Sequence, residues 1–346
     1  MTVARRKLID MVRAESRHPV ADVELQSLED VVADAGELPD ERLAMMFACA
    51  HPAIDAGIRS PLILQVVLGL DAKAIASAFL TSPAAMGKRL VRAKEKIRQA
   101  GISFRVPGRE ELPARLDTVL EAIYAGFTEG WSDADGADLV RRDLIEESLF
   151  LARLVVELMP GEAEARGLLA LMLYANSRRR ARRNEDGDFV PLSMQNPAFW
   201  DGSQIAEAEG LLHRAAEMGC VGRFQLEAAI QSAHANRCRK GAANWADVLE
   251  LYDALFALTG SPVVLINRAL AVAELHGAKE ALASMQELKA DARLAEYQPY
   301  WAARAELLAR TGEHAEARHA YQVAIGLERD AAVRQFLERR MDAIGD

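Results

Sequence analysis

The residues best suited to binding a ligand by charge are basic ones gathered in one short window. Between Ala72 and Ala100 the chain has seven lysines and arginines and one acid, Glu95, so this window carries a net charge of +6, whereas the whole 346-residue chain carries −9. Clustered Lys and Arg side chains neutralise the phosphates of nucleic acid. A net negative charge over the whole chain argues against general nucleic-acid binding. The window, rather than the whole chain, is therefore the candidate nucleic-acid-binding surface.

Cap and turn signals predict that this window is a helix-turn-helix. Asp71 is suited to cap a short helix, and Ser82 followed by Pro83 is a start signal for a second helix that ends near Gln99. The apolar residues of the second helix recur at helical spacing, at Met86, Leu90 and Ile97. A short helix, a tight turn and a longer basic helix form a unit whose second helix can enter the major groove of DNA. The alternative is a solvated amphipathic helix, which also carries a run of charges.

Other residues with chemical potential lack the spacing that enzymes or metal sites require. The acids of Glu146–Glu147 and Glu162–Glu164 have the spacing of a solvated helix surface, and Asn184–Asp188 lacks the later glutamate of a calcium loop. The three cysteines and the histidines show no metal-ligand spacing. The histidines, His314 and His319 beside a predicted turn and His51 before a proline, are interpreted as structural. The sequence therefore predicts no enzymatic activity, no cofactor and no metal.

The whole sequence predicts an all-α protein of several parts. Residues 1–18 contain a short helical segment, 19–38 form an acidic linker, 39–104 hold the helix-turn-helix, and 105–346 form a helical domain without a convincing strand pattern. No stretch approaches the roughly 18 apolar residues that cross a bilayer, and no apolar signal segment follows the N-terminus. With few cysteines, we expect a cytoplasmic protein that has no membrane contact.

Near the C-terminus the spacing of small and large residues matches one tetratricopeptide repeat. The matching residues are Trp301, Ala305, Leu308, Gly312, Ala317, Tyr321 and Ala324. A weaker copy lies upstream, where Ala269 precedes Ala305 by 36 positions, and a third, looser copy falls around Ala229. We therefore predict paired helices in this region, preceded by a long loop at about 184–201.

Residues 64–98, LQVVLGLDAKAIASAFLTSPAAMGKRLVRAKEKIR, closely resemble region 4 of extracytoplasmic-function (ECF) sigma factors, the part that reads the −35 promoter element. The ending AxxxxLVRAKEKIR is the distinctive part of this resemblance. With the segments ACAHPAID, FRVP and FQLEAAIQSAHA, nearly the whole chain is similar to the subgroup of these factors that has a long C-terminal extension. Residues 2–15, TVARRKLIDMVRAE, are similar to the last helix of sigma region 2, and the earlier part of that region is not matched.

The resemblance also implies which residues contact DNA. It places Ser82 at the start of the DNA-reading helix, Ala85, Gly87, Lys88, Val91 and Arg92 against the −35 bases, and Arg89 and Lys96 against phosphates. Base contacts specify the sequence, whereas phosphate contacts set the register. Many such factors have a basic residue in place of Gly87 and a glycine in place of Leu80, so the base preference at the first of these positions stays open.

The function that the resemblance implies is that of a sigma factor for transcription initiation. Such a chain binds promoter DNA and the RNA polymerase core, while its repeats regulate activity or hold another protein. Two alternatives remain: a sigma-derived DNA-binding regulator that does not initiate transcription, and a helical-repeat scaffold whose helix-turn-helix binds protein. Polymerase dependence separates the first two functions, and a steep fall of DNA affinity with salt argues against the third.

Overall fold

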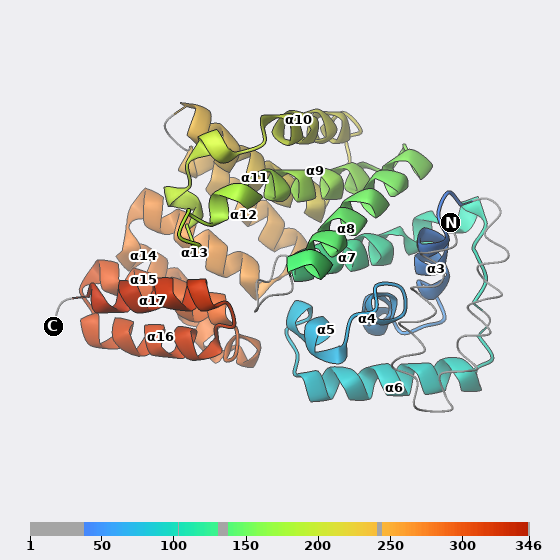
Figure 1. Cartoon of the computed structure of the whole chain (residues 1–346), viewed down its shortest axis with the longest axis horizontal. Coiled ribbons are helices and arrows are strands. Elements are labelled where there is room, and N and C mark those ends of the chain that lie inside the picture. The colour runs from blue at the N-terminus through green and yellow to red at the C-terminus, as the bar shows by residue number, and fades with distance from the viewer. Residues whose placement is uncertain (1–37, 103, 131–137, 241–243, 345–346) are drawn as a thin grey trace. The chain divides into compact units, whose positions relative to one another are not determined.

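The computed structural model describes residues 38–102, 104–130, 138–240 and 244–344. For residues 138–142 and 237–240 it describes the backbone alone. Every regular element in these ranges is an α-helix or a short 3-10 helix (Figure 1), so the predicted all-α fold is confirmed. The predicted segment 1–18 and all but the last residue of the predicted linker 19–38 lie outside the described residues. None of the described helices combines the length and the apolar character that crossing a bilayer requires.

The chain divides into two compact units, each of which has its own core. Among the described residues the first unit comprises 38–130 and 140–158, and the second comprises 138–139 and 159–344. The first unit contains α3 (Glu41–Cys49), α4 (Ala56–Val66), α5 (Ala72–Ala78), α6 (Pro83–Gln99), α7 (Pro113–Gly130) and most of α8 (Asp138–Leu158). The sequence placed a domain boundary at residue 104, whereas the first compact unit continues to Leu158.

The first unit runs past the predicted boundary because α7 packs on the helix-turn-helix. Val119 and Ile123 of α7 are fully buried, and α7 contacts α3, α4 and α5. The hydroxyl of Ser60 in α4 donates to the Glu121 carboxylate of α7, and its oxygen lies 3.4 Å from the Thr118 carbonyl oxygen. A core made only by α4 to α6 is small for an independent domain. The packing of α7 therefore extends the first unit beyond the predicted boundary.

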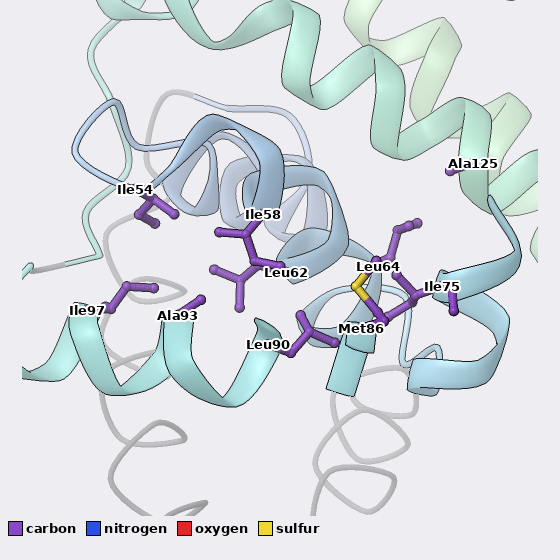
Figure 2. Close-up of a cluster of buried hydrophobic side chains, with 11 residues drawn as sticks. Ile54, Ile58, Leu62, Leu64, Ile75, Met86, Leu90, Ala93, Ile97 and Ala125 are labelled. Atoms are coloured by element: carbon purple, nitrogen blue, oxygen red, sulfur yellow. The ribbon is translucent and has the colours of Figure 1, made fainter. Parts of the chain in front are cut away.

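The core of the helix-turn-helix is a single apolar cluster (Figure 2). It joins α4, α5, α6 and Ala125 of α7. Its members, all buried, are Ile54, Ile58, Leu62, Leu64, Ile75, Ala76, Met86, Leu90, Ala93, Ile97 and Ala125. The predicted inward residues of α6 belong to it, which fixes the rotation of α6 about its own axis.

The second unit is a series of paired helices. These are α9 (Ala163–Ser177), α10 (Gly202–Ala216), α11 (Arg223–Lys240), α12 (Trp245–Thr259), α13 (Pro262–His276), α14 (Ala278–Ser284), α15 (Gln298–Thr311), α16 (His314–Leu327) and α17 (Ala331–Asp342). The predicted pair at 301–324 is present as α15 and α16, joined at Gly312, whose φ of 82° lies in the left-handed region. Ala269 and Ala305 are both fully buried, which agrees with their equivalent places in the sequence pattern.

Between α14 and α15 the chain forms two 3-10 helices, η5 (Gln286–Ala290) and η6 (Ala292–Leu294), which pack into the core of α13 to α15. The predicted long loop lies between α9 and α10, and it is held against α17. Arg183 pairs with Asp330 at 2.5 Å, and the rings of Phe189 and Phe336 lie 5.5 Å apart. The loop is therefore part of the packed second unit.

Candidate nucleic-acid interface

The sequence positions α6 through its own first residues. The hydroxyl of Ser82 accepts a hydrogen bond from the Ala85 amide at 3.3 Å, and Pro83 is the first helical residue, so the predicted cap is confirmed. The side chain of Asp71 caps α5 in the same way, through the Ala74 amide at 2.8 Å. These caps satisfy amide groups that have no partner inside their own helices.

The turn between α5 and α6 contains one residue in an unusual conformation. Leu80 has a φ of 48°, the only positive φ of a residue other than glycine in the described chain. Glycine adopts such a φ without strain, whereas a residue with a Cβ does not. The left-handed turn is therefore kept here with a leucine, at a cost of about 1–2 kcal/mol.

The two faces of α6 differ sharply in chemistry. Met86, Leu90, Ala93 and Ile97 are at most 8% exposed, and they recur at the spacing of one helix face. Lys88, Arg92 and Lys96 are exposed and follow one another at four-residue intervals on the other side of the helix. The rise of 1.5 Å per residue places successive members about 6 Å apart along the axis.

No acid of the described chain neutralises this basic row. Neither ion pairs nor hydrogen bonds to the side chains of Lys88, Arg92 and Lys96 are found within the described residues. The acid on the same helix, Glu95, is held by Arg98 and by the Gln99 amide group at 2.6 Å, and these contacts lower the pKa of its carboxyl. The row therefore keeps its positive charge free for an external anion.

The structure gives Arg89 a contact inside the chain that the sequence did not predict. Its guanidinium donates to the Gly57 carbonyl at 2.7 Å and so connects α6 with the start of α4. The contact uses one of the five guanidinium N–H groups, so Arg89 can still donate to a phosphate. Because the two residues are 32 positions apart, nothing in the local pattern around α6 indicates the contact.

The three small or apolar residues predicted to face bases are all at least partly accessible. Val91 is 69% exposed, which is unusual for a large apolar side chain. Ala85 and Gly87 are half-buried. A Cβ added at Gly87 would meet only Ala72, at 3.9 Å, so the position has room for a side chain. The predicted DNA-contacting residues thus all belong to α6 or its cap.

Two acids that the sequence assigned to a solvated helix surface have structural partners instead. Glu147 of α8 pairs with Arg42 of α3, and burial raises the pKa of its carboxyl. Glu164 of α9 accepts hydrogen bonds from the amides of Phe224 and Gln225, at 2.9 and 3.1 Å, and caps α11. The solvated assignment was wrong for both because their partners are distant in the sequence.

A buried arginine forms a further structural centre in the first unit. The side chain of Arg115 is 1% exposed, donates to the Phe47 carbonyl at 2.9 Å and contacts the Glu111 carboxylate at 3.0 Å. His51 lies near these charges, and burial, followed by Arg115, lowers the pKa of its imidazole. This arrangement ties α3 to α7. The residues that the structure describes contain no group of three or more His, Cys, Asp or Glu side chains arranged to hold a metal ion.

Comparison with known proteins identifies relatives of the chain. Residues 115–216 match a family described as a family of unknown function, DUF6596. An uncharacterized protein of Rhizobium meliloti (strain 1021), R00370, is 37% identical over 98% of this chain and 82% of its own length. No solved structure matches the chain. The identity and its extent establish that the chain belongs to the same protein family as this Rhizobium meliloti protein.

Proposed function

We propose that the chain is a DNA-binding transcription protein of the ECF sigma-factor type, whose helix α6 reads the −35 promoter element in the major groove. The observation that carries this proposal is the unneutralised row of Lys88, Arg92 and Lys96 on the exposed face of α6. On a helix that serves only as a solvated surface, such residues gain by pairing with acids four positions away. In this row, by contrast, Lys88 is followed four positions later by Arg92, and Arg92 by Lys96.

The rest of the exposed face of α6 also suits a duplex. Arg and Lys can donate to guanine edges, and an exposed apolar side chain such as Val91 can pack on a thymine methyl group. Small residues at Ala85 and Gly87 let the helix backbone come close to the bases.

The proposal extends to the partners that the resemblance implies. In that role the first unit docks on the RNA polymerase core in the cytoplasm, and the helical pairs of the second unit regulate the activity or hold a protein partner. In this proposal the chain binds DNA and protein and does not catalyse a reaction. Glu147 and Glu164, two of the carboxylates considered for chemistry, are engaged in an ion pair and a helix cap.

Duplex binding by the full chain tests the proposal. A labelled random-sequence duplex is titrated at several salt concentrations with the parent chain, with the triple variant Lys88→Ala, Arg92→Ala, Lys96→Ala, and with Lys279→Ala. Lys279 is an exposed lysine of α14 and serves as the control for loss of charge. We expect affinity that falls steeply with salt for the parent and the control, and a loss of most of this affinity in the triple variant.

Binding that is independent of salt, or a triple variant that binds like the parent, contradicts the proposal and favours the scaffold. Run-off transcription with purified core polymerase then separates initiation from regulation. Transcripts that start at a defined site only when the chain is present support a sigma factor. DNA binding without polymerase-dependent initiation supports the sigma-derived regulator.

A further inference from the structure

The second unit contains a pocket that the DNA-binding proposal does not use. The pocket has a volume of about 660 Å³ and lies between the η5 and η6 stretch, α15 and α16. This volume is within the range of about 300–1,000 Å³ that is typical of small-molecule sites. Its wall is mostly apolar, with residues such as Leu288, Leu294 and Ala320. A few charged side chains are set into this apolar wall.

The most notable charged side chain of the wall is Arg304 of α15. It is only 17% exposed, and its nearest acid is Glu316, at 3.7 Å and 64% exposed. This distance exceeds that of a hydrogen bond. Arg304 has no hydrogen bond within the described residues. The Arg304 side chain is therefore largely packed against the wall, and its guanidinium has donors that a ligand in the pocket can engage.

The other charges near the pocket also favour an anion. Lys289 is exposed at the same pocket. The Asp291 carboxylate, which also lines the pocket, is already held by Arg293 at 2.6 Å. The weak pair between Arg304 and Glu316 can open without loss of a hydrogen bond. When that pair opens, the guanidinium of Arg304 is available to an anionic ligand.

Aromatic rings provide the apolar part of the same site. Trp301 packs edge to face on Tyr300, with ring centroids 5.4 Å apart, and on His319, with centroids 6.4 Å apart. The indole N–H of Trp301 donates to the Ala295 carbonyl at 2.9 Å, which fixes the ring orientation. All four residues line the pocket. Fixed rings of this kind suit a planar ligand.

We propose that this pocket binds a small aromatic carboxylate, with the carboxylate on Arg304 and the ring against Trp301 and His319. Arginine suits this role because its planar guanidinium binds a carboxylate through two parallel hydrogen bonds. The proposal rests on the second unit alone and is tested without DNA, so it stands or falls separately from the DNA-binding role of α6.

Calorimetric titration of the full chain with two matched probes tests the site. The probes are 2-naphthoate and its neutral counterpart 2-naphthamide. We expect saturable binding of both at one site, with the carboxylate preferred by at least about tenfold, because hydrogen bonds to a charged group are the stronger kind. Arg304→Gln removes the preference and keeps the amide affinity. Arg304→Lys retains part of the preference, because its charge remains but its paired geometry does not.

The matched control is Arg310→Gln, which removes an arginine of the same helix that pairs with Glu274 at 2.9 Å and does not line the pocket. This variant keeps the full preference for the carboxylate. The inference is overturned if neither probe saturates the chain, if both bind equally, or if Arg304→Gln keeps the preference. If Arg304→Gln does not fold, Arg304→Lys decides, and an unchanged preference in it overturns the role of the paired geometry.

Discussion

Two substitutions on the same face of α6 should weaken DNA binding in different ways. Arg92 lies one turn closer than Lys96 to the N-terminus of α6, the end of a recognition helix that reaches base edges. Lys96 follows one turn later, about 6 Å along the axis, where a phosphate contact is expected. Arg92→Ala should therefore reduce the preference for a selected duplex, whereas Lys96→Ala should weaken all duplexes alike.

The magnitudes follow from these two roles. Loss of a base contact at Arg92 costs about 1–3 kcal/mol, or about 5- to 150-fold in the ratio between the selected duplex and a scrambled one. Loss of one phosphate contact at Lys96 reduces the slope of log affinity against log salt by about 0.9. Between about 50 and about 200 mM salt, the parent therefore loses roughly 3.5-fold more affinity than Lys96→Ala.

Fluorescence anisotropy measures both quantities. The full chain first selects a preferred duplex from a randomised library, and the selected and scrambled duplexes are then titrated across the salt range. Lys279→Ala controls for net charge, and circular dichroism confirms that each variant keeps its helices. The reasoning is refuted if Lys96→Ala lowers the sequence preference while Arg92→Ala changes only the salt slope, or if neither differs from the control.

Four further predictions concern packing, backbone strain and charge in the two units. Gly167→Ala should destabilise the chain by about 1–3 kcal/mol because its Cβ would lie 2.7 Å from the Gln225 backbone nitrogen. Position 87 has space for a methyl group, so Gly87→Ala should stabilise the chain by up to about 1 kcal/mol. Urea unfolding measures both variants, and a Gly167→Ala chain as stable as Gly87→Ala contradicts the packing. The free energy of unfolding of Leu80→Gly should be within about 1 kcal/mol of the parent value, because relief of the left-handed strain offsets the greater entropy that glycine gives the unfolded chain. A larger loss of stability in the same assay shows that no strain is stored at this position. Arg105, followed by the Gly108 amide, lowers the pKa of Glu111 to about 2 from its ordinary 4.5. Stability from this carboxylate is therefore present above pH 4.5 and lost as the pH falls towards 2, a loss that acid titration followed by circular dichroism should find reduced in Glu111→Gln.

The parts of the fold that local signals determine were predictable from the sequence. Ser82, Pro83 and Asp71 act within three residues of their own positions, so the caps of α5 and α6 could be placed. The rotation of α6 about its axis followed from its apolar spacing, which also places Lys88 and Arg92 on the outward side of the helix. These are interactions that a single helix already specifies.

The parts that depend on distant partners were not predictable. The contact of Arg89 with Gly57 joins two helices that are distant in the sequence. The apolar face of α7 was visible in its sequence, but nothing in that sequence says that this face packs on α4. The pocket was missed for a similar reason. His319 was interpreted as structural, and only the fold brings it beside Trp301 and near the η5 and η6 stretch.

Site-specific crosslinking tests the placement of α6 on DNA most directly. A photoreactive benzoylphenylalanine replaces Val91, which is 69% exposed on α6, or Leu258, which is 54% exposed on α12 of the second unit. Each chain is irradiated with the selected duplex. We predict crosslinks to duplex bases from position 91 and none from position 258. Crosslinks from position 258 alone, or none from position 91 while the chain is bound to the duplex, would contradict the assignment of α6 as the DNA-reading helix.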